Sequence, residues 1–352
     1  MERVLVTGYP GAIGAALVKH LLNEGTEVIA VVRAQKDRVV APQKGLRVIY
    51  ADITDPDLSV EKFLGYGRID VVIHAAGLVQ YRESLRELTF RTNVEGTQNI
   101  LRIARQLDIA RFVYISTAYV SGTADHFGED ELGYVPYGAN PYIESKVEAE
   151  KLVRAYPGDA LIIRLSTVIG DVKTGEIGRP GGYSGFVGPF FMMRGKLSLY
   201  PDEPFWMGVN RETSMNLETR EWTVDMTCRA AFSRISGTIH LTHPHPVNMG
   251  FLFEETFRRN LGLPLTTDRV ESERMAPVGD TRWLRLQGSV SNWVKYFGTF
   301  VQHDTVYGRT RAMTVPGYID PPEITSSVIK IQVDYMKRRL FARTRRLTVK
   351  AA

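Results

Sequence analysis

The sequence has almost no cysteine and no long apolar run. Its single cysteine, Cys228, excludes an intramolecular disulfide and a cysteine-rich metal site. No stretch approaches the roughly 18 consecutive apolar residues that a membrane-spanning helix needs. Met1-Glu2-Arg3 leads into an apolar run of only three residues, so we expect no signal peptide. These absences favour a cytosolic enzyme or binding protein.

Most of the chain also lacks an excess of basic residues. It has 44 Lys and Arg against 39 Asp and Glu, a net charge of +5. The last 18 residues carry seven of the basic residues and no acid, which leaves residues 1–334 at −2. The seven are Lys337, Arg338, Arg339, Arg343, Arg345, Arg346 and Lys350. Nucleic-acid-binding proteins more often spread basic residues over a face of the fold, so we expect no nucleic-acid partner.

Strand-like and helix-like segments alternate through the first half of the chain. Strands are predicted at Val4–Thr7, Glu27–Val32, Arg47–Tyr50, Val71–His74, Arg111–Ile115 and Ala160–Leu165. Helices are predicted at Ala12–Asn23, Ser84–Phe90, Val94–Gln106 and Tyr142–Ala155. Apolar strands separated by helices are typical of a parallel sheet covered on both faces. The sequence therefore predicts a Rossmann-type, doubly wound α/β fold.

The pattern changes after Leu165. Residues 171–216 are rich in Gly, Pro, Met and aromatic residues and show little periodicity. A helix at Trp222–Phe232, a strand at Thr238–Leu241 and a helix at Phe251–Leu261 follow. We predict a Rossmann domain over residues 1–170 with a return near 210–236, a smaller discontinuous substrate domain over 171–209 and 237–320, and a basic amphipathic helix or tail over 321–352.

A glycine-rich loop joins the first predicted strand to the first predicted helix. In Thr7–Gly14, Gly8 permits a tight turn, Gly11 lets the backbone approach a pyrophosphate, and Gly14 permits close contact between helix and strand. The helix N-terminus adds free N–H groups and the positive end of a dipole. Because the glycines lie between a strand and a helix, they predict a dinucleotide site rather than an ordinary turn.

The end of the second strand favours NADPH over NADH. An acidic residue that binds the ribose 2′-hydroxyl is usual there, but this chain has Arg33, with Lys36 and Arg38 close behind. A guanidinium suits a 2′-phosphate, although Arg33 at a strand end could also be a solvated residue. Asp52 follows the third strand, where a carboxylate either reaches the adenine amino group or simply caps a turn.

A tyrosine and a lysine stand four residues apart in the predicted helix at Tyr142–Ala155. Tyr142 and Lys146 therefore share one helix face, and the ammonium is expected to lower the pKa of the phenol. Thr117 ends a predicted parallel strand at the carboxyl edge of the sheet, where such folds bind ligands. Ser116 is a weaker candidate, because neighbours on a strand point to opposite faces. Asn93 opens another helix, and each of these residues alone could be a cap or a surface pair.

Together these motifs resemble the extended short-chain dehydrogenase/reductases. The residues that carry the resemblance are Thr7–Gly14, His74-Ala75-Ala76-Gly77, Asn93, Ser116–Val120 and Tyr142–Lys146. Thr92–Thr97, Ser116–Val120 and Arg164–Asp171 are similar to the fatty acyl-CoA reductase and thioester (carboxylic acid) reductase branch. Tyr9-Pro10 and Ala12-Ile13 depart from that branch, which often has Thr and Phe-Leu there.

The resemblance implies a role for each site residue. Thr117 would hydrogen-bond the substrate carbonyl, Tyr142 would protonate the oxyanion, Lys146 would hold the nicotinamide ribose, and Asn93 would support a water-linked proton path from Lys146. The residues expected to bind the cofactor are Thr7, Gly8, Gly11, Ala12, Ile13, Gly14, Arg33, Arg38, Asp52, Ile53, Ala75, Ala76, Gly77, Tyr142 and Lys146.

The branch implies NADPH-dependent reduction of an acyl thioester to an aldehyde or alcohol. The thioester would arrive as acyl-CoA or on an acyl carrier protein. An extended-type ketoreductase, dehydrogenase or epimerase that acts on a sterol-like compound or a nucleotide sugar is the alternative. A dinucleotide-binding subunit without catalysis is a second alternative, which the presence of Thr117, Tyr142 and Lys146 opposes.

Four features of the second half leave alternatives open. Gly181–Met193 suits either a mobile lid over an aliphatic chain or ordinary packing. His240, His243 and His245 lack a nearby acidic cluster, so we expect no metal there. We expect Cys228 to be a buried apolar residue.

The basic helix, capped by Thr325 or Ser326, would pack on its own protein, contact a membrane peripherally or bind an acidic carrier. A homodimer is also open.

Overall fold

The computed structural model describes residues 2–33, 40–133, 140–178, 181–297 and 303–350. The chain divides into two compact units. Unit 1 comprises Met1–Ser166, Arg220–Thr242 and Thr305–Asp320, and unit 2 comprises Thr167–Thr219, His243–Asp304 and Pro321–Ala352. Each unit is therefore assembled from three separate stretches of the chain.

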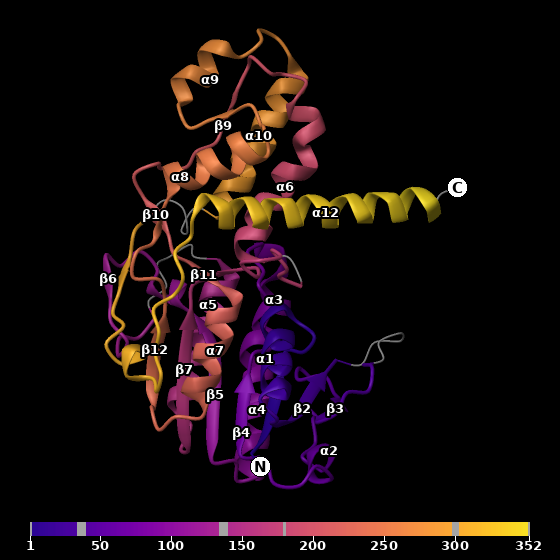
Figure 1. The fold of residues 1–352 in the computed structure, drawn as a ribbon, viewed down its shortest axis with the longest axis vertical. Helices are drawn as coiled ribbons and strands as arrows, with labels where there is room; N and C mark the ends of the chain where they lie inside the picture. The colour runs from indigo at the N-terminus through magenta and orange to yellow at the C-terminus, as the bar shows by residue number, and fades with distance from the viewer. Residues whose placement is uncertain (1, 34–39, 134–139, 179–180, 298–302, 351–352) are drawn as a thin grey trace. The chain divides into compact units, whose positions relative to one another are not determined.

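Unit 1 is built on a seven-stranded sheet with the order β12-β7-β5-β4-β1-β2-β3 (Figure 1). Its strands are β1 (Arg3–Thr7), β2 (Glu27–Val32), β3 (Leu46–Tyr50), β4 (Val71–His74), β5 (Arg111–Thr117), β7 (Asp159–Leu165) and β12 (Gly237–Leu241). Every neighbouring pair is parallel. The predicted Rossmann-type doubly wound fold is confirmed.

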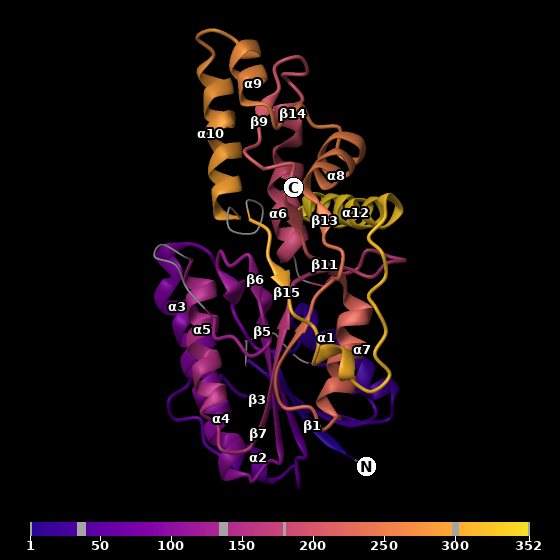
Figure 2. The same ribbon diagram turned by 90° about the vertical axis from the view of Figure 1, so that its left-hand side faces the viewer.

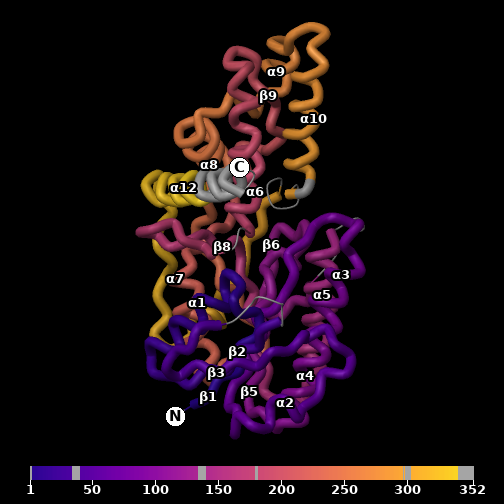
Figure 3. The backbone as a smooth tube through the Cα atoms, turned by 90° about the vertical axis from the view of Figure 1, so that its right-hand side faces the viewer, coloured from indigo at the N-terminus to yellow at the C-terminus, as the bar shows by residue number. Residues whose placement is uncertain are grey.

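Helices cover both faces of this sheet. They are α1 (Ala12–Asn23), α2 (Glu61–Leu64), α3 (Arg86–Phe90), α4 (Gly96–Gln106), α5 (Pro141–Arg154) and α7 (Arg220–Ala231), with short turns at Glu83–Leu85, Ala118–Ser121 and Ala312–Thr314 and a π-helical turn at Arg91–Glu95. Figures 2 and 3 show α1 and α7 on one face and α3, α4 and α5 on the other. Strands buried on both faces explain why they read as continuous apolar runs.

Two segments predicted for the substrate domain belong to unit 1 instead. The strand predicted at Thr238–Leu241 is β12, which pairs in parallel with β7 and completes one edge of the sheet. Residues 305–320 return to the same unit, where β15 (Val306–Tyr307) pairs with β6 (His126–Phe127). Local sequence patterns do not indicate which strand a segment pairs with, so the sequence misplaced both.

Unit 2 contains short strands and longer helices. The strands are β8 (Thr167–Ile169), β9 (Phe205–Trp206), β10 (Ser214–Met215), β11 (Leu217–Thr219), β13 (Val247–Asn248) and β14 (Leu265–Thr266). The helices are α6 (Gly182–Leu197), α8 (Met249–Phe253), α9 (Arg269–Met275), α10 (Thr281–Tyr296) and α12 (Ser326–Lys350), with a π-helical turn at Glu254–Asn260. The strands pair two by two as β8–β11, β9–β14 and β10–β13.

An aromatic cluster forms much of the core of unit 2. Phe186 on α6 packs against Phe190, Phe257 and Phe297 with ring centroids 4.9 to 5.9 Å apart. These four side chains are buried. For Gly181–Met193 the sequence allowed either a mobile lid or ordinary packing. In the structure this segment is part of α6, and its Phe186 and Phe190 side chains pack in the core.

The first part of α12 packs on unit 2. Ile329, Val333 and Met336 lie on one face of the helix and are buried. Thr325 caps the helix by accepting a hydrogen bond from the Val328 amide at 3.5 Å. For this part of the tail the packing alternative is correct. None of the helices in the described residues is long and apolar enough to cross a membrane.

Candidate active site

The loop between β1 and α1 has the geometry of a phosphate-binding turn. Gly8 has a positive φ of +85°, and a Cβ there would meet the Ala75 backbone at 2.6 Å. A Cβ on Gly11 or Gly14 would meet the Gly8 carbonyl oxygen, again at 2.6 Å. α1 begins at Ala12, and Gly11 has no side chain to cap it. Its first N–H groups are therefore available to an anion, which fits the phosphates of a dinucleotide.

Arg33 and Asp52 meet at the ends of β2 and β3. The Arg33 Nε and Asp52 Oδ2 atoms are 3.2 Å apart, and both side chains are largely exposed. Asp52 also accepts hydrogen bonds from the amide and hydroxyl of Thr54, each at 2.9 Å. Partial burial raises the pKa of Asp52, but the Thr54 hydrogen bonds and the charges of Arg33 and Arg91 outweigh it and leave the pKa below its usual value. Lys36 and Arg38 lie outside the described residues.

Two other predicted cofactor residues, Ile53 and Thr7, are buried. Ile53 is buried under α4, where a Cβ on Gly96 would meet its Cδ1 at 2.9 Å. The Thr7 hydroxyl is also buried, accepts a hydrogen bond from the Ala76 amide at 3.1 Å and lies 2.7 Å from His74 Nδ1. Thr7 thus fixes Ala75–Gly77 beside the loop instead of presenting its hydroxyl outward.

A row of three residues runs across the sheet beneath these loops. Thr7, His74 and Tyr114 are register partners on β1, β4 and β5, and we call them the His74 row. The His74 ring stacks on Tyr114, with centroids 5.7 Å apart. Burial and the nearby Lys146 charge lower the pKa of His74 to about 3, so this histidine is neutral.

Thr117 and Tyr142 come together at the carboxyl edge of the sheet. Thr117 ends β5, and Tyr142 lies in the first turn of α5, which Asn140 caps by accepting a hydrogen bond from the Ile143 amide at 3.1 Å. Burial raises the pKa of Tyr142 to about 12, although its hydrogen bond with Thr117 lowers it. Tyr81 packs edge-on against the Tyr142 ring at 6.0 Å. The two hydroxyls that the sequence paired are thus neighbours.

Lys146 is buried one turn after Tyr142. Its Nζ atom donates to the Tyr114 hydroxyl at 3.1 Å and to the Ile115 carbonyl at 2.7 Å. Burial lowers the pKa of Lys146 to about 8, while the charge of Glu150 raises it. The expectation that Lys146 lowers the pKa of Tyr142 does not hold in this structure, because burial of the phenol is the largest effect and raises that pKa.

Asn93 is buried in the π-helical turn Arg91–Glu95. Its amide nitrogen donates to the Leu78 carbonyl at 3.0 Å and to the Ser145 hydroxyl at 2.9 Å. Its amide oxygen accepts from the Leu78 amide at 2.7 Å. Because the side chain is occupied by protein groups, it fixes the segment after Gly77 to α5. The water-linked proton path from Lys146 that the resemblance implies for Asn93 stays a prediction.

The match to a family model decides the classification. Residues 4–180, half of the chain, match the model described as the NAD dependent epimerase/dehydratase family. This chain belongs to that family. The predicted resemblance to the extended short-chain dehydrogenase/reductases is thereby confirmed.

One curated relative is similar over part of the chain. The 3β-hydroxysteroid dehydrogenase/Δ5→4-isomerase of Mycobacterium tuberculosis is 37% identical over 166 residues, which are 45% of this chain and 44% of that protein. The chain thus spans less than half the length of this relative.

Two solved structures share the fold over nearly the whole chain. The terminal R domain from the myxalamid PKS-NRPS biosynthetic pathway has a TM-score of 0.73 at 21% identity and covers 97% of this chain and 92% of its own. The Bordetella bronchiseptica enzyme WbmH, in complex with NAD+, has a TM-score of 0.67 at 19% identity and covers 96% and 99%. At these identities the likeness concerns the fold.

A second row of polar residues lies nearby in this epimerase/dehydratase-family sheet. Ser116, Arg164 and His240 are register partners on β5, β7 and β12, and we call them the Arg164 row. Arg164 is fully buried and donates to both carboxylate oxygens of Glu150, at 3.0 and 2.7 Å. The Ser116 hydroxyl donates to the same carboxylate at 2.6 Å. Ser116 therefore faces away from Thr117, as strand alternation predicts.

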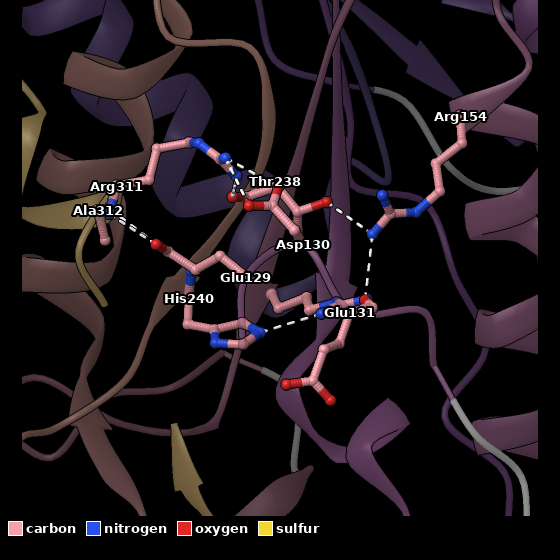
Figure 4. A network of polar contacts seen from close by, with 9 residues as sticks. Glu129, Asp130, Glu131, Arg154, Thr238, His240, Arg311 and Ala312 are labelled. Carbon is pink, nitrogen blue, oxygen red and sulfur yellow. Dashed lines mark hydrogen bonds and ion pairs between the residues drawn. The ribbon is translucent and has the colours of Figure 1, made fainter. Parts of the chain in front are cut away.

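The Arg164 row connects to residues 305–320. His240 Nδ1 lies 2.8 Å from the Gly308 carbonyl, so this nitrogen carries the hydrogen and Nε2 accepts from Arg164 at 3.1 Å. Burial and the charge of Arg164 lower the pKa of His240 to about 3. Figure 4 shows Glu129 accepting from the Ala312 amide, at 2.9 Å, beside His240. The sequence contained a signal for this network, since an arginine inside the apolar strand Asp159–Leu165 needs a buried partner.

The other residues considered from the sequence have structural contacts. His243 Nδ1 accepts from the His245 amide at 3.0 Å. Among the described residues, no group of three or more His, Cys, Asp or Glu side chains is arranged to hold a metal ion. Cys228 is buried on α7, and burial raises the pKa of its thiol to about 12, which suits a packing role.

Proposed function

We propose that this protein is an NADPH-dependent reductase of acyl thioesters. The observation that carries the proposal is the hydrogen-bonded pair of Thr117 and Tyr142 hydroxyls beside a buried lysine. A carbonyl oxygen placed between these hydroxyls would receive a hydrogen bond from Thr117 and a proton from Tyr142. Both side chains lie at the carboxyl edge of a parallel sheet, where this fold class binds its ligands.

The protonation state of Tyr142 favours reduction over oxidation. With a pKa of about 12, Tyr142 is a phenol at neutral pH and is ready to give its proton to an oxyanion. The oxidative direction needs the phenolate as a base, which becomes abundant only at higher pH. Thr117 then keeps the substrate oxygen within reach of the phenol.

The loop and Lys146 supply the binding groups for the dinucleotide. The N–H groups at the start of α1 would hold the phosphates, and Lys146 would hold the ribose beside Gly77. Arg33 supports NADPH, because a guanidinium at the end of β2 can pair with a 2′-phosphate. When bound, the reduced cofactor supplies the hydride that the carbonyl carbon accepts.

A thioester is the substrate best supported by the residues. Thr92–Thr97, Ser116–Val120 and Arg164–Asp171 resemble thioester reductases, and the whole-chain fold is similar to that of an R domain from a PKS-NRPS pathway. After the carbon has gained hydride and the oxygen a proton, the carbon–sulfur bond breaks, and the thiol and an aldehyde leave. A second equivalent of hydride and proton would give the alcohol. Acyl-CoA or an acyl carrier protein would present the thioester.

A keto or hydroxysteroid substrate is the second candidate. It is favoured by the 37% identity to a 3β-hydroxysteroid dehydrogenase. That similarity covers 45% of the chain. The experiment below therefore includes both substrate classes.

Substrate choice is tested by following NADPH absorbance with long-chain acyl-CoA, a ketosteroid panel and UDP-sugars. We expect oxidation of NADPH with acyl-CoA and release of free thiol. Tyr142→Phe should lower kcat by about a hundred-fold to ten-thousand-fold, because it removes the proton donor. Tyr156→Phe, a matched change at a partly buried tyrosine packed against the core of unit 1, should leave turnover intact. Activity confined to ketosteroids or sugars would reject the thioester proposal, and NADPH binding without any turnover would point to a non-catalytic subunit.

Cofactor choice is tested with Arg33→Asp. Since Arg33 is exposed and pairs with Asp52, the change should leave the fold intact. We expect KM for NADPH to rise and the preference to move toward NADH, because the new carboxylate repels a 2′-phosphate and accepts from a 2′-hydroxyl. An unchanged preference would remove Arg33 from the cofactor site.

A further inference from the structure

We infer that Tyr114 is a positioning residue that holds Lys146 as an ammonium with one N–H left free. The inference rests on the proposed role of Lys146 in binding the ribose. It starts from the count of donors, since an ammonium has three N–H groups. Among the residues that the structure describes, two of them are used, one by the Tyr114 hydroxyl at 3.1 Å and one by the Ile115 carbonyl at 2.7 Å. The third direction is then fixed by tetrahedral geometry.

The Tyr114 hydroxyl is itself locked as an acceptor toward Lys146. Thr97 donates to the Asn93 main-chain carbonyl at 2.6 Å, and a carbonyl can only accept. The Thr97 oxygen must therefore accept in its other hydrogen bonds. The Lys146 ammonium has no lone pair, so the Tyr114 hydroxyl oxygen must be the acceptor in their 3.1 Å hydrogen bond.

The same reasoning assigns the neighbouring histidine. His74 Nε2 lies 3.0 Å from the Thr97 oxygen, so Nε2 carries the hydrogen. Its Nδ1 then accepts from Thr7, which lies 2.7 Å away. The neutral His74 ring that stacks on Tyr114 therefore has both of its nitrogens in hydrogen bonds to other residues.

The charge environment explains why Lys146 needs this support. The titratable groups that face it are Glu150 and Tyr142 on its own helix, Tyr114 on β5 and neutral His74 on β4. The nearest carboxylate, Glu150, is hydrogen-bonded to Arg164 and Ser116. Tyr114 contributes a second attraction, since the Lys146 Nζ lies 4.5 Å from the centroid of its ring. Burial raises the pKa of Tyr114 well above its ordinary value, so it remains a neutral partner.

Tyr114→Phe tests the inference because it keeps the ring and removes only the hydroxyl. The 13Cε resonance of Lys146, assigned by its absence in Lys146→Met, is titrated from about pH 6 to about pH 10, around the usual pKa range of a perturbed lysine. We expect the Lys146 midpoint to fall by about one to two pH units, the equivalent of a lost hydrogen bond to a charged group.

Binding of NADPH gives the second readout. Its affinity should weaken as Lys146 loses its proton, and in Tyr114→Phe this weakening should occur at correspondingly lower pH. Tyr156→Phe removes a hydroxyl from a partly buried tyrosine packed against the same core and should leave both curves unchanged. An unshifted Lys146 midpoint in Tyr114→Phe would overturn the inference, as would an equal loss of NADPH affinity at every pH. The resonance does not depend on turnover, so failure of the thioester assay would leave this result standing.

Discussion

The two buried cations of unit 1 lie in similar positions but have opposite surroundings. Lys146 contacts Tyr114 of the His74 row, where Tyr114 stacks on the neutral His74. Arg164 belongs to the Arg164 row and contacts the neutral His240. Arg164 is paired with both oxygens of Glu150, and its guanidinium lies 4.5 Å from the centroid of the Phe127 ring. Lys146 instead donates to two uncharged oxygens.

This difference separates a structural charge from a chemical one. A guanidinium bonded in bidentate fashion to a carboxylate is fixed in its geometry, so Arg164 holds β7 to α5. A buried ammonium without a hydrogen-bonded carboxylate has a pKa of about 8 and can respond to a ligand. Glu150 accounts for this difference, because its oxygens accept hydrogen bonds from Arg164 and Ser116 and none from Lys146.

Arg164→Met should have the largest effect on stability. It leaves the Glu150 carboxylate buried without its partner, which typically costs about 3–5 kcal/mol. Urea denaturation monitored by circular dichroism measures this free energy of unfolding. The double variant Arg164→Met with Glu150→Leu should recover part of the loss, since no unpaired charge remains. A full loss in the double variant would mean that shape, and not charge, dominates at this row.

Ser116→Ala should have an intermediate effect. The change removes one hydrogen bond to a buried carboxylate, which is worth about 1.5–3 kcal/mol, while two bonds from Arg164 remain. Turnover should change little, because Ser116 faces Glu150 and Thr117 faces Tyr142. Thr117→Val is the matched comparison and should lower kcat while preserving the free energy of unfolding. If Ser116→Ala lost activity instead, the assignment of the two hydroxyls would be reversed.

Lys146→Met should have the smallest effect on stability and a large one on catalysis. The pKa of Lys146 is lower in the folded protein than its ordinary value of 10.5, so at neutral pH the folded state bears the cost of burying the charge. Methionine removes that cost, and the free energy of unfolding should stay the same or rise. The kcat should fall by at least about a hundred-fold. A destabilisation equal to that of Arg164→Met would show that both cations are structural.

Lys146 also predicts the sign of a pH effect on wild-type stability. Between its folded pKa of about 8 and its ordinary value of 10.5, the unfolded chain binds more protons than the folded one. The contribution of Lys146 to the free energy of unfolding therefore rises with pH across this window. Urea midpoints of wild type and Lys146→Met should converge as the pH rises through it, and parallel curves would contradict the lowered pKa.

Local sequence patterns predicted much of this molecule, and contacts across the sheet account for what they missed. Ala12–Asn23, Glu27–Val32 and Val71–His74 have the predicted bounds, because apolar periodicity and glycine positions act within one segment. The helix predicted at Val94–Gln106 begins with a π-helical turn instead, since i→i+5 bonding leaves no distinct periodicity.

The candidate site was predictable only where its chemistry is local. The spacing of Tyr142 and Lys146 and the alternation of Ser116 and Thr117 follow from helix and strand geometry. The roles of Tyr114 and Glu150 depend on which strands and helices meet, and a single sequence does not reveal that. The raised pKa of Tyr142 depends on burial, which the spacing of two residues cannot show.

The contacts of Glu129 have a consequence for how the chain is made. Its carboxylate accepts from the amides of Arg311 and Ala312, 182 and 183 residues further along. Most strands of the Rossmann sheet therefore leave the ribosome long before these amides do. Until then, the Glu129 carboxylate lacks the hydrogen bonds from Arg311 and Ala312. Unit 2 residues 243–304 are synthesised during that interval. The last buried contacts of the cofactor-binding unit thus close only after most of the other unit has been made.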